Sequence, residues 1–466
     1  MIVKELIFRN AQRNSIMIFL IAGFVSMSVF LHPFVSIAIA SLLLAGLFFA
    51  QHMDFALYVL ILMTPFVDFQ IVWGELNVPI ADAFAMLMFI SWALRALLFR
   101  GESITNTIRS NTPVAIPFLL FLIACTLSFF NTPDMAASIK YFLRPMLFFY
   151  LMFMIIPYVS IENTKILKRA LVVSFTLGIV ISLMGLISLF LPEQSGEIFR
   201  RALPISIFGM YPLGTNHNLI AEVLVAVIPL GWFLSTHERN KHRKQALKLA
   251  SVFVASICVL TFSRAGWIVL FSEIILYLFY RYFHEREKLW RLLKTFIIAV
   301  IPLALVMYFF SHTLTVQNSN ANRNLLNAIA FQAWTKHPWI GNGLNTFLPF
   351  VQENTIFILE FGSALESHGV IQKLAVEVGL IGTAAFFIFL TAVGRNLYTA
   401  YQKSQPGEVR DALVFASIAA FGILLFEFFN TSYFIGKLWL PIGIALATAN
   451  MVRTTSQTQK SYEWAS

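Results

Sequence analysis

Charged side chains are scarce in this sequence of 466 residues, because only 12% are Asp, Glu, Lys or Arg, whereas 58% are hydrophobic. A soluble domain carries about 25% charged residues, so this chain has too few to cover a surface that faces water. The composition therefore excludes a soluble globular protein, and it also excludes disordered and fibrous chains. It indicates an integral membrane protein.

Cysteine is also rare, and no pattern of metal ligands is present. Cys125 and Cys258 both lie in apolar segments, which is typical of small buried hydrophobic residues and indicates no disulfide scaffold. No Asp-x-Asp pair occurs, and no group of His, Cys, Asp and Glu has the spacing of metal ligands. We therefore expect no metal and no other cofactor.

Long apolar runs dominate the chain, and a transmembrane helix needs about 20 apolar residues. Candidate spans are 15–31, 34–50, 55–72, 80–98, 113–130, 141–158, 170–191, 217–235, 247–262, 267–280, 295–311, 370–394, 412–429 and 433–451. These runs are too long for the strands of a transmembrane β-barrel. We predict an all-α, polytopic membrane protein with 12 to 14 transmembrane helices. Residues 15–50 form either two spans or a hairpin, since only His32 and Pro33 separate their halves.

The distribution of basic residues predicts the orientation. The chain has 33 Lys and Arg against 23 Asp and Glu, a net charge of +10. With the N-terminus in the cytoplasm, most of these cations fall in inside loops, as in 239–248 and 281–294, which satisfies the positive-inside rule. We therefore expect both termini in the cytoplasm, and the basic excess does not predict nucleic-acid binding.

The remaining cations fall on the outer half of the protein, against that rule. Arg264 is the strongest candidate, because the turn 261–267 has too few polar residues to leave the membrane and a cation there needs a partner. An outward cationic cavity implies an anionic ligand, and a phosphate or pyrophosphate suits the guanidinium fork.

The chain divides into N-terminal transmembrane helices (1–191), a region with two long outer loops (192–394), and C-terminal transmembrane helices with a cytoplasmic tail (395–466). The loops, 192–218 and 311–369, are where we expect function. Residues 323–334 predict an amphipathic helix with Leu326, Ile329, Ala330, Ala333 and Trp334 on one face, and Pro and Gly in 337–343 end it. Beyond this, Lys373 is placed to pair with Glu377 at i,i+4.

Four ordered pieces of the chain resemble the O-antigen ligase and polymerase family of polytopic bacterial glycosyltransferases. They are Arg201 followed by Asn-His-Asn-Leu-Ile-Ala at 216–221, Ser-Arg-Ala-Gly at 263–266, the stretch 323–334 followed by His-Pro-Trp-Ile-Gly-Asn-Gly at 337–343, and His368 with ten residues to Gly379. Together they cover residues 195–385, and the N-terminal helices add only a compatible topology.

The resemblance implies transfer of a glycan from an undecaprenyl pyrophosphate carrier to a hydroxyl of a lipid or glycan acceptor, as in lipopolysaccharide and cell-envelope polysaccharide biosynthesis. It places the reaction at the outer face of the bacterial cytoplasmic membrane, without a metal. By the same resemblance, Arg264 and one or both of Arg200 and Arg201 hold the pyrophosphate, and His368 serves the acceptor hydroxyl. Further candidate substrate-binding residues in the same outer segments are Arg323, Asn218 and Lys373.

The chemistry of these residue types agrees with the resemblance, since the leaving pyrophosphate needs cationic stabilisation and the incoming hydroxyl needs a base such as His. Three alternatives stay open. A polymerase uses the same donor as a ligase. A transporter of an anionic substrate belongs to another class, and it predicts two related halves, which the sequence lacks. His368 itself is either a base or a helix cap.

Overall fold

The computed structural model describes residues 23, 33–66, 70–73, 76–95, 114–148, 150–191, 200–207, 209–311, 314–430 and 436–463. Its elements are α2 (Pro33–Gln51), α3 (Met53–Met63), β1 (Gln70–Trp73), β2 (Leu76–Pro79), α4 (Ile80–Arg95), α6 (Ala115–Leu127), the 3₁₀ turn η2 (Ser128–Asn131), α7 (Met135–Tyr141), the π-helical η3 (Phe142–Phe148) and η4 (Tyr150–Ile155), α8 (Ile156–Ser160), α9 (Thr164–Ser188), α10 (His217–His237), α11 (Lys241–Leu260), α12 (Arg264–Tyr282), α13 (Arg286–Ser311), α14 (Leu314–Lys336), α15 (Phe347–Glu353), α16 (Thr355–Phe361), α17 (Val370–Lys403), α18 (Glu408–Glu427) and α19 (Gly436–Glu463).

Among the described residues, the fold is helical apart from one short pair of antiparallel strands, β1 and β2, in which Gln70 pairs with Pro79 and Trp73 with Leu76. This agrees with the predicted all-α class, although the predicted span 55–72 is wrong at its end, because α3 stops at Met63 and residues 70–73 form a strand. The predicted span 15–31 lies outside the described residues except for Gly23, so the choice between two spans and a hairpin there stays a prediction.

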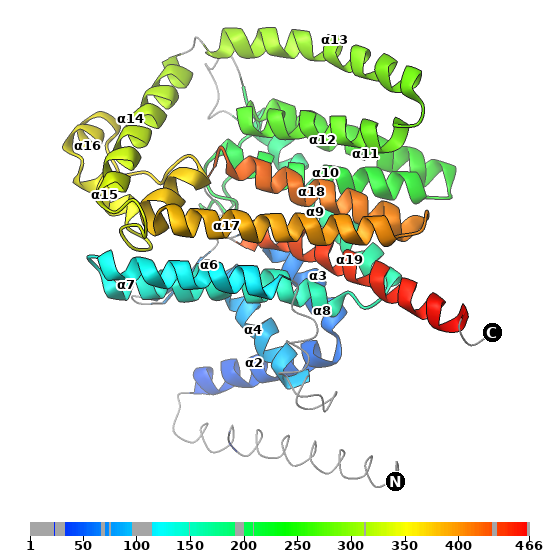
Figure 1. The fold of residues 1–466 in the computed structure, drawn as a ribbon, viewed down its shortest axis with the longest axis horizontal. Coiled ribbons are helices and arrows are strands. Elements are labelled where there is room, and N and C mark those ends of the chain that lie inside the picture. The colour runs from blue at the N-terminus through cyan, green and yellow to red at the C-terminus, as the bar shows by residue number, and fades with distance from the viewer. Residues whose placement is uncertain are drawn as a thin grey trace.

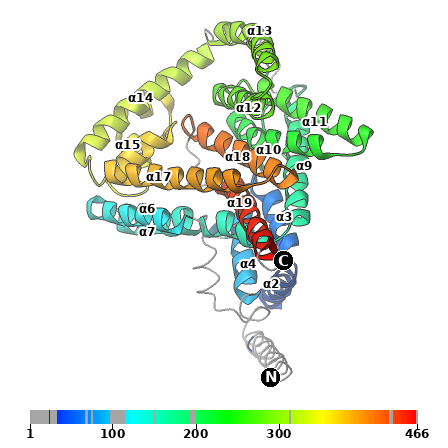
Figure 2. The ribbon, with the colours of Figure 1, turned by 45° about the vertical axis from the view of Figure 1, so that its right-hand side comes forward.

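The main body is a bundle of long helices centred on α10, which packs against α9, α11, α12 and α18 (Figures 1 and 2). Of the most apolar 18-residue stretch of α10, 78% is buried inside the protein, whereas the buried share of the corresponding stretch of α13 is 11%. The helix α13 lies at the upper edge of the bundle in Figure 1. Since apolar residues on its outside have no protein against them, α13 is the helix most suited to contact lipid.

Six described helices are long and apolar enough to cross a membrane: α9, α10, α12, α13 (over Arg286–Val306), α17 and α18. The pair formed by Ala40–Gln51 and α3 passes the same test together, but it is bent by 114°. The protein is therefore a multi-pass membrane protein, and the predicted count of 12 to 14 spans is not confirmed. Several apolar runs form short helices, such as α4 and α6, while residues 142–148 and 150–155 are π-helical.

Side-chain caps explain where several of these helices begin. Asn163, Asn216, Asn240 and Ser263 each accept a hydrogen bond from a backbone N–H in the first turn of α9, α10, α11 and α12. Such residues accept hydrogen bonds from N–H groups that have no partner within the helix. Loss of one such cap lowers the stability of the protein by about 1 kcal/mol. Helix starts are thus fixed by single polar residues between apolar runs.

The predicted outer loop 311–369 is largely helical where it is described. As predicted, α14 buries Leu326, Ile329, Ala330 and Ala333, leaves Trp334 half-buried, and ends at Lys336 before the Pro and Gly residues. With α15, α16 and Val376, this face of α14 forms a small second core, separate from that of the bundle. We refer to helices α14 to α16 as the α14–α16 unit.

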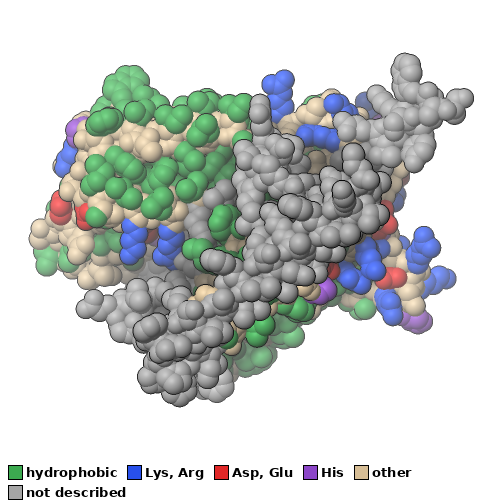
Figure 3. Space-filling view, turned by 90° about the horizontal axis from the view of Figure 1, so that it is seen from below, with side chains coloured by type: hydrophobic (Ala, Val, Ile, Leu, Met, Phe, Trp, Pro, Cys, Tyr) green, Lys and Arg blue, Asp and Glu red, His purple; other side chains and the backbone are tan. Residues whose placement is uncertain are grey.

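Charge is distributed unevenly along the bundle. In Figure 1 the turns after α12 and α17 and the C-terminus lie at the right-hand end, and the α14–α16 unit lies at the left. Figure 3 shows a broad apolar area on the left half of the lower face, while Lys and Arg side chains gather toward the right-hand end. The helices α10, α12 and α18 are linked through Asp411, which lies 3.1 Å from His237 Nε2 and accepts a hydrogen bond from Tyr280 Oη at 2.6 Å.

Candidate functional site

The first turns of α10 and α12 are joined directly. Ser263 Oγ donates a hydrogen bond to Asn218 Oδ1 at 2.7 Å and accepts one from Gly266 N–H at 3.2 Å. The two helices approach closely here, since a Cβ on Gly266 would lie 2.9 Å from the Cβ of Ala221. Glycine at 266 is therefore a packing requirement, and Ser263 both caps α12 and holds α10 beside it.

The turn predicted at 261–267 is shorter in the structure, because α11 ends at Leu260 and α12 begins at Arg264, so only residues 261–263 connect them. Thr261 Oγ1 donates to the Cys258 carbonyl at 2.6 Å, and Phe262 takes a left-handed conformation with φ of 54°. The chain at 200–203 lies against this turn, because Ala202 N–H donates to the Leu260 carbonyl at 2.8 Å. In this way a segment far earlier in the sequence is brought to the start of α12.

Arg264, the first residue of α12, reaches the α14–α16 unit. Its Nη1 donates to Asn320 Oδ1 at 2.8 Å. Arg323 follows Asn320 by about one turn of α14, and its Nε is buried without a hydrogen-bond partner among the described residues. Burial and the nearby charge of Arg264 lower the pKa of Arg323. Neither arginine forms an ion pair with Asp or Glu in the part of the chain that is described.

His368, just before α17, lies in the electrostatic field of the same two arginines. Its half-buried imidazole has its pKa lowered to about 4, first by burial and then by the charges of Arg323 and Arg264. His217, at the start of α10, feels the charges of Arg201, Arg323 and Arg264. Five residues from four separate segments therefore share one electrostatic environment, which we call the cationic cluster: Arg201, His217, Arg264, Arg323 and His368.

Helix geometry adds to this positive potential. The cluster lies at the N-terminal ends of α10, α12 and α17, where unpaired N–H groups and the helix dipole favour negative charge. Guanidinium groups hold phosphate oxygens through paired N–H donors. The arrangement is thus suited to bind a phosphorylated anion, with an uncharged imidazole beside it.

A second feature ties the α14–α16 unit to α17 at a break in that helix. Gly379 has φ of 66°, so the helix is interrupted and the neighbouring backbone groups lose their partners. Leu380 and Ile381 N–H donate to the carbonyls of Pro338 and Trp339, at 2.9 and 3.1 Å. In return, the carbonyls of Val376 and Glu377 accept from the segment 342–343.

Asn342 secures this junction with its side chain. Its Nδ2 donates to the carbonyls of Ala333 and Val376 at 3.0 and 2.9 Å, and the residue is buried. Asn131 Nδ2 adds a bond of 2.8 Å to the Gly341 carbonyl. The pieces 337–343 and 368–382 are therefore one structural unit, which fixes the position of His368 relative to Arg323.

Two of the predicted substrate-binding residues have structural contacts. Lys373 is fully buried, and its Nζ lies 2.7 Å from Glu366 and 3.2 Å from Glu377, so the predicted i,i+4 pair with Glu377 is confirmed. Arg200 is exposed, and its Nη1 donates to the Leu189 carbonyl at the end of α9, at 2.9 Å. Arg201 and Arg323 belong to the cationic cluster, and Asn218 lies at its edge.

Sequence reasoning missed Asn320 and Gln372 as parts of the site. Gln372 Nε2 donates to Asn327 Oδ1 at 2.6 Å, which links α17 to α14 beside the cluster. The side-chain oxygen of Asn322 is buried with no hydrogen-bond partner in the described residues. The Asn-rich stretch 318–327 is the signal that pointed to these contacts, because asparagine is unusual inside a helix unless its amide is used.

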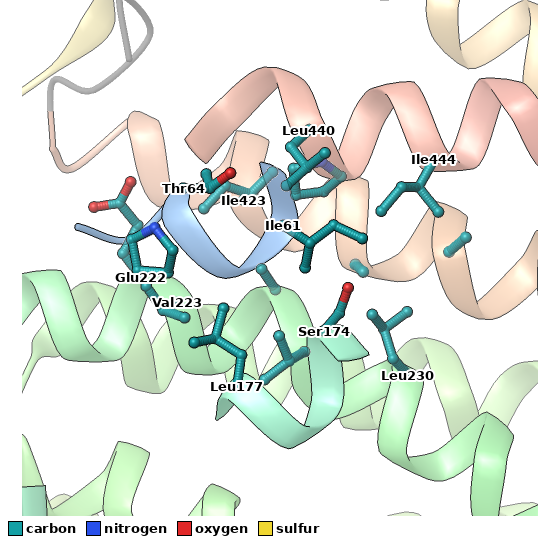
Figure 4. A pocket seen from close by; sticks show the side chains of 16 residues that line it. Ile61, Thr64, Ser174, Leu177, Glu222, Val223, Leu230, Ile423, Leu440 and Ile444 are labelled. Atoms are coloured by element: carbon teal, nitrogen blue, oxygen red, sulfur yellow. The ribbon is translucent and has the colours of Figure 1, made fainter. Parts of the chain in front are cut away.

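A separate cavity of about 60 Å³ lies deeper in the bundle between α3, α9, α10, α18 and α19 (Figure 4). Glu222 is the one charged residue among those that line it, at the edge of the view, and the rest of the lining is mostly apolar. No residue of the cationic cluster lines this cavity, so it is not the candidate site. Among the described residues, no group of three or more His, Cys, Asp or Glu is arranged to hold a metal ion.

Comparison with known families agrees with this geometry. Residues 249–387 match the family model described as O-antigen ligase. This part of the chain is similar to the O-antigen ligase family. The match confirms the resemblance predicted from the sequence, and it includes Arg264, Arg323 and His368. No curated protein matches the chain.

The segment matched by the family model begins after the first of the four resembling pieces. Arg201 and the stretch 216–221 lie outside the matched range. The structure nevertheless joins them to it, through the bond between Asn218 and Ser263 and through the charge of Arg201 beside His217. The electrostatic site thus includes residues on both sides of the family boundary.

Proposed function

We propose that this protein transfers a glycan from an undecaprenyl pyrophosphate carrier to an acceptor hydroxyl at the outer face of the bacterial cytoplasmic membrane, as an O-antigen ligase does. One observation carries the proposal: Arg264, Arg323 and His368 share one electrostatic environment at the start of α17, and neither arginine is neutralised by a carboxylate in the described residues. Uncompensated cations beside a membrane are costly, so a site that keeps them is expected to bind an anion.

The pyrophosphate is the group that the arginines hold. When the bond between the sugar C1 and the pyrophosphate oxygen breaks, the oxygen leaves with the electron pair and gains negative charge. Arg264 and Arg323, with Arg201, stabilise that charge, and fixed cations act most strongly where water is excluded. The hydrogen bond from Arg264 to Asn320 orients its guanidinium before the donor arrives.

His368 takes the proton of the acceptor hydroxyl as its oxygen attacks C1. With the cluster empty, its pKa of about 4 keeps the ring uncharged at neutral pH, which is the form that accepts a proton. Binding of the anionic donor offsets the arginine charges, so the His368 pKa rises toward neutrality and the ring becomes a stronger base. Donor binding therefore makes His368 a better proton acceptor for the step that follows.

A transporter is less well supported by the break in α17. In transporters, the backbone groups freed at a broken helix line a cavity and coordinate the substrate or ion. At Gly379, the freed groups of residues 376, 377, 380 and 381 are hydrogen-bonded to the segment 338–343 instead. The break is used for attachment of the α14–α16 unit.

The test separates donor binding from transfer in purified, folded protein. Arg264→Ala should weaken binding of the lipid-linked donor, whereas His368→Ala should keep donor binding and lose transfer by roughly 10² to 10⁴ in rate. Normal transfer by both variants would refute the proposal. The lipid-linked glycan that accumulates in a deletion strain distinguishes a ligase from a polymerase. Full-length polymer indicates that the missing protein is a ligase, and single repeat units indicate that it is a polymerase.

A further inference from the structure

A second pocket lies within the α14–α16 unit, between α14, α15 and the start of α16, and has a volume of about 180 Å³. It is lined by Ile329, Gln332, Ala333, Lys336, Phe350, Glu353 and Asn354. No residue of the cationic cluster contributes to it. It is therefore a separate site, which neither the family match nor the transfer chemistry assigns.

The lining combines hydrogen-bonding groups with apolar surface. The side chains of Gln332, Lys336 and Glu353 make no hydrogen bond or ion pair with any other described residue, so their donors and acceptors are available to a ligand. Ile329 and Ala333 form a buried apolar floor. Phe350 offers a ring, over which Lys336 Nζ lies at 4.6 Å from the centroid.

This combination fits a sugar ring. Sugar hydroxyls both donate and accept, which matches an amide, an ammonium and a carboxylate in one pocket, and the C–H face of the ring suits apolar and aromatic side chains. The volume is below the roughly 300 to 1,000 Å³ of sites for drug-sized ligands, which is the scale of a single ring and not of a lipid chain. Lys336 and Glu353 balance in charge, so the pocket favours an uncharged ligand over a phosphate.

The distance of the pocket from Arg323 along α14 indicates which sugar of the glycan the pocket would hold. At a rise of 1.5 Å per residue, Gln332 lies about 13 Å and Lys336 about 20 Å along the helix from Arg323. A sugar held here is thus not the one attached to the pyrophosphate. We propose that this pocket binds one uncharged sugar ring of the glycan, several units away from the bond that breaks. This rests on the proposed function, and it assigns the pocket to glycan binding and not to chemistry.

The test uses a free oligosaccharide, released by mild acid from the lipid-linked glycan of the same cells, and measures its binding to the purified full-length protein by titration calorimetry. Gln332→Ala and Glu353→Gln should each weaken binding about three- to tenfold, the effect of losing one hydrogen bond. Gln352→Ala and Glu360→Gln are matched controls, because both residues are exposed on α15 or α16 and outside the pocket. Both controls should bind as the wild type does.

A fifth variant separates this inference from the proposed function. Arg264→Ala should lose transfer but bind the free oligosaccharide normally, because Arg264 does not line the pocket. If transfer by the wild type fails while pocket variants still weaken oligosaccharide binding, only the proposed function is refuted. Equal binding by pocket variants and controls, or no binding by the wild type, would overturn the assignment of this pocket.

Discussion

Ser263 Oγ lies 2.7 Å from Asn218 Oδ1, and this single hydrogen bond joins the first turns of α10 and α12 at the edge of the cationic cluster. Both residues belong to short polar pieces between apolar helices. Ser263 Oγ also caps α12, because the same oxygen accepts a hydrogen bond from Gly266 N–H. The alignment of Arg264 with the start of α10 thus depends on one buried hydroxyl.

Ser263→Ala should lower the free energy of unfolding by about 1 to 2 kcal/mol, because it removes a helix cap and leaves the Asn218 oxygen without its donor. Thermal unfolding in detergent measures the change. Ser272→Ala is the matched control, since Ser272 is on the same helix and only bonds back to the Ile268 carbonyl. If both variants unfolded at the same temperature, the hydrogen bond between α10 and α12 would contribute nothing to the free energy of unfolding.

Arg264→Lys should be nearly as damaging to glycan transfer as Arg264→Ala, because a point ammonium cannot supply a two-pronged contact to phosphate oxygens and also keep the bond to Asn320. Loss of one charge-assisted hydrogen bond of about 1.5 to 3 kcal/mol corresponds to roughly 10- to 100-fold in activity. Arg200→Lys, at the exposed end of α9, should be tolerated. Full transfer by the Arg264→Lys variant at normal protein level would remove Arg264 from the donor site.

The pH dependence of kcat/KM, which reports groups of the free enzyme, should reflect the lowered pKa of His368. The imidazole is uncharged above its pKa of about 4, so activity should hold as pH falls from 7 to 5 and decline only as pH approaches 4. A decline centred near pH 6.5 would contradict the lowered pKa.

The same shift predicts a stability effect. The folded state binds the proton of His368 more weakly than the unfolded state, so its contribution to stability is complete above about pH 6.5 and decreases as pH falls toward 4. His368→Gln should therefore lose less stability between pH 7 and 5 than the wild type. Unfolding midpoints measured at both pH values check this, and equal losses would contradict it.

Gly379→Ala should destabilise the protein by about 2 to 4 kcal/mol, since φ of 66° disfavours a side chain and a Cβ would lie 2.4 Å from the Trp339 carbonyl group. Gly394→Ala on the same helix is the control, because nothing lies within 4 Å of its added Cβ and alanine favours a helix. Transfer should fall with the first variant only. Similar behaviour of the two would contradict the role of the break.

The predicted orientation is testable by labelling single cysteines with a maleimide that does not cross membranes. Cys125 and Cys258 are buried, so they give little background. Ser363→Cys, beyond α16, should be labelled in cells with a permeabilised outer membrane, whereas Gln405→Cys, between α17 and α18, should need disruption of the inner membrane. Both positions are exposed. The reverse pattern would overturn the charge-based orientation and the outer placement of the site.

Composition and spacing by themselves determined the helical membrane class, the amphipathic face of α14 and the pair Lys373–Glu377. The resemblance of four sequence pieces predicted the family that the match at residues 249–387 supports. These depend on contacts within one helix or on local hydrophobic periodicity, which the sequence carries directly. The number of spans was harder to predict, because hydropathy does not reveal where an apolar run shortens, bends or becomes π-helical.

Only the tertiary structure decided which cations lie near one another. Arg200 and Arg201 are equivalent in the sequence, yet one caps α9 and the other lies by His217, because the chain direction at 200–202 is set by a bond to the turn before α12. Likewise, nothing local predicts that the backbone groups freed at Gly379 are satisfied by residues 338–343. Contacts between segments tens of residues apart arise from packing of whole helices, and their geometry is not encoded in the pattern of any one segment.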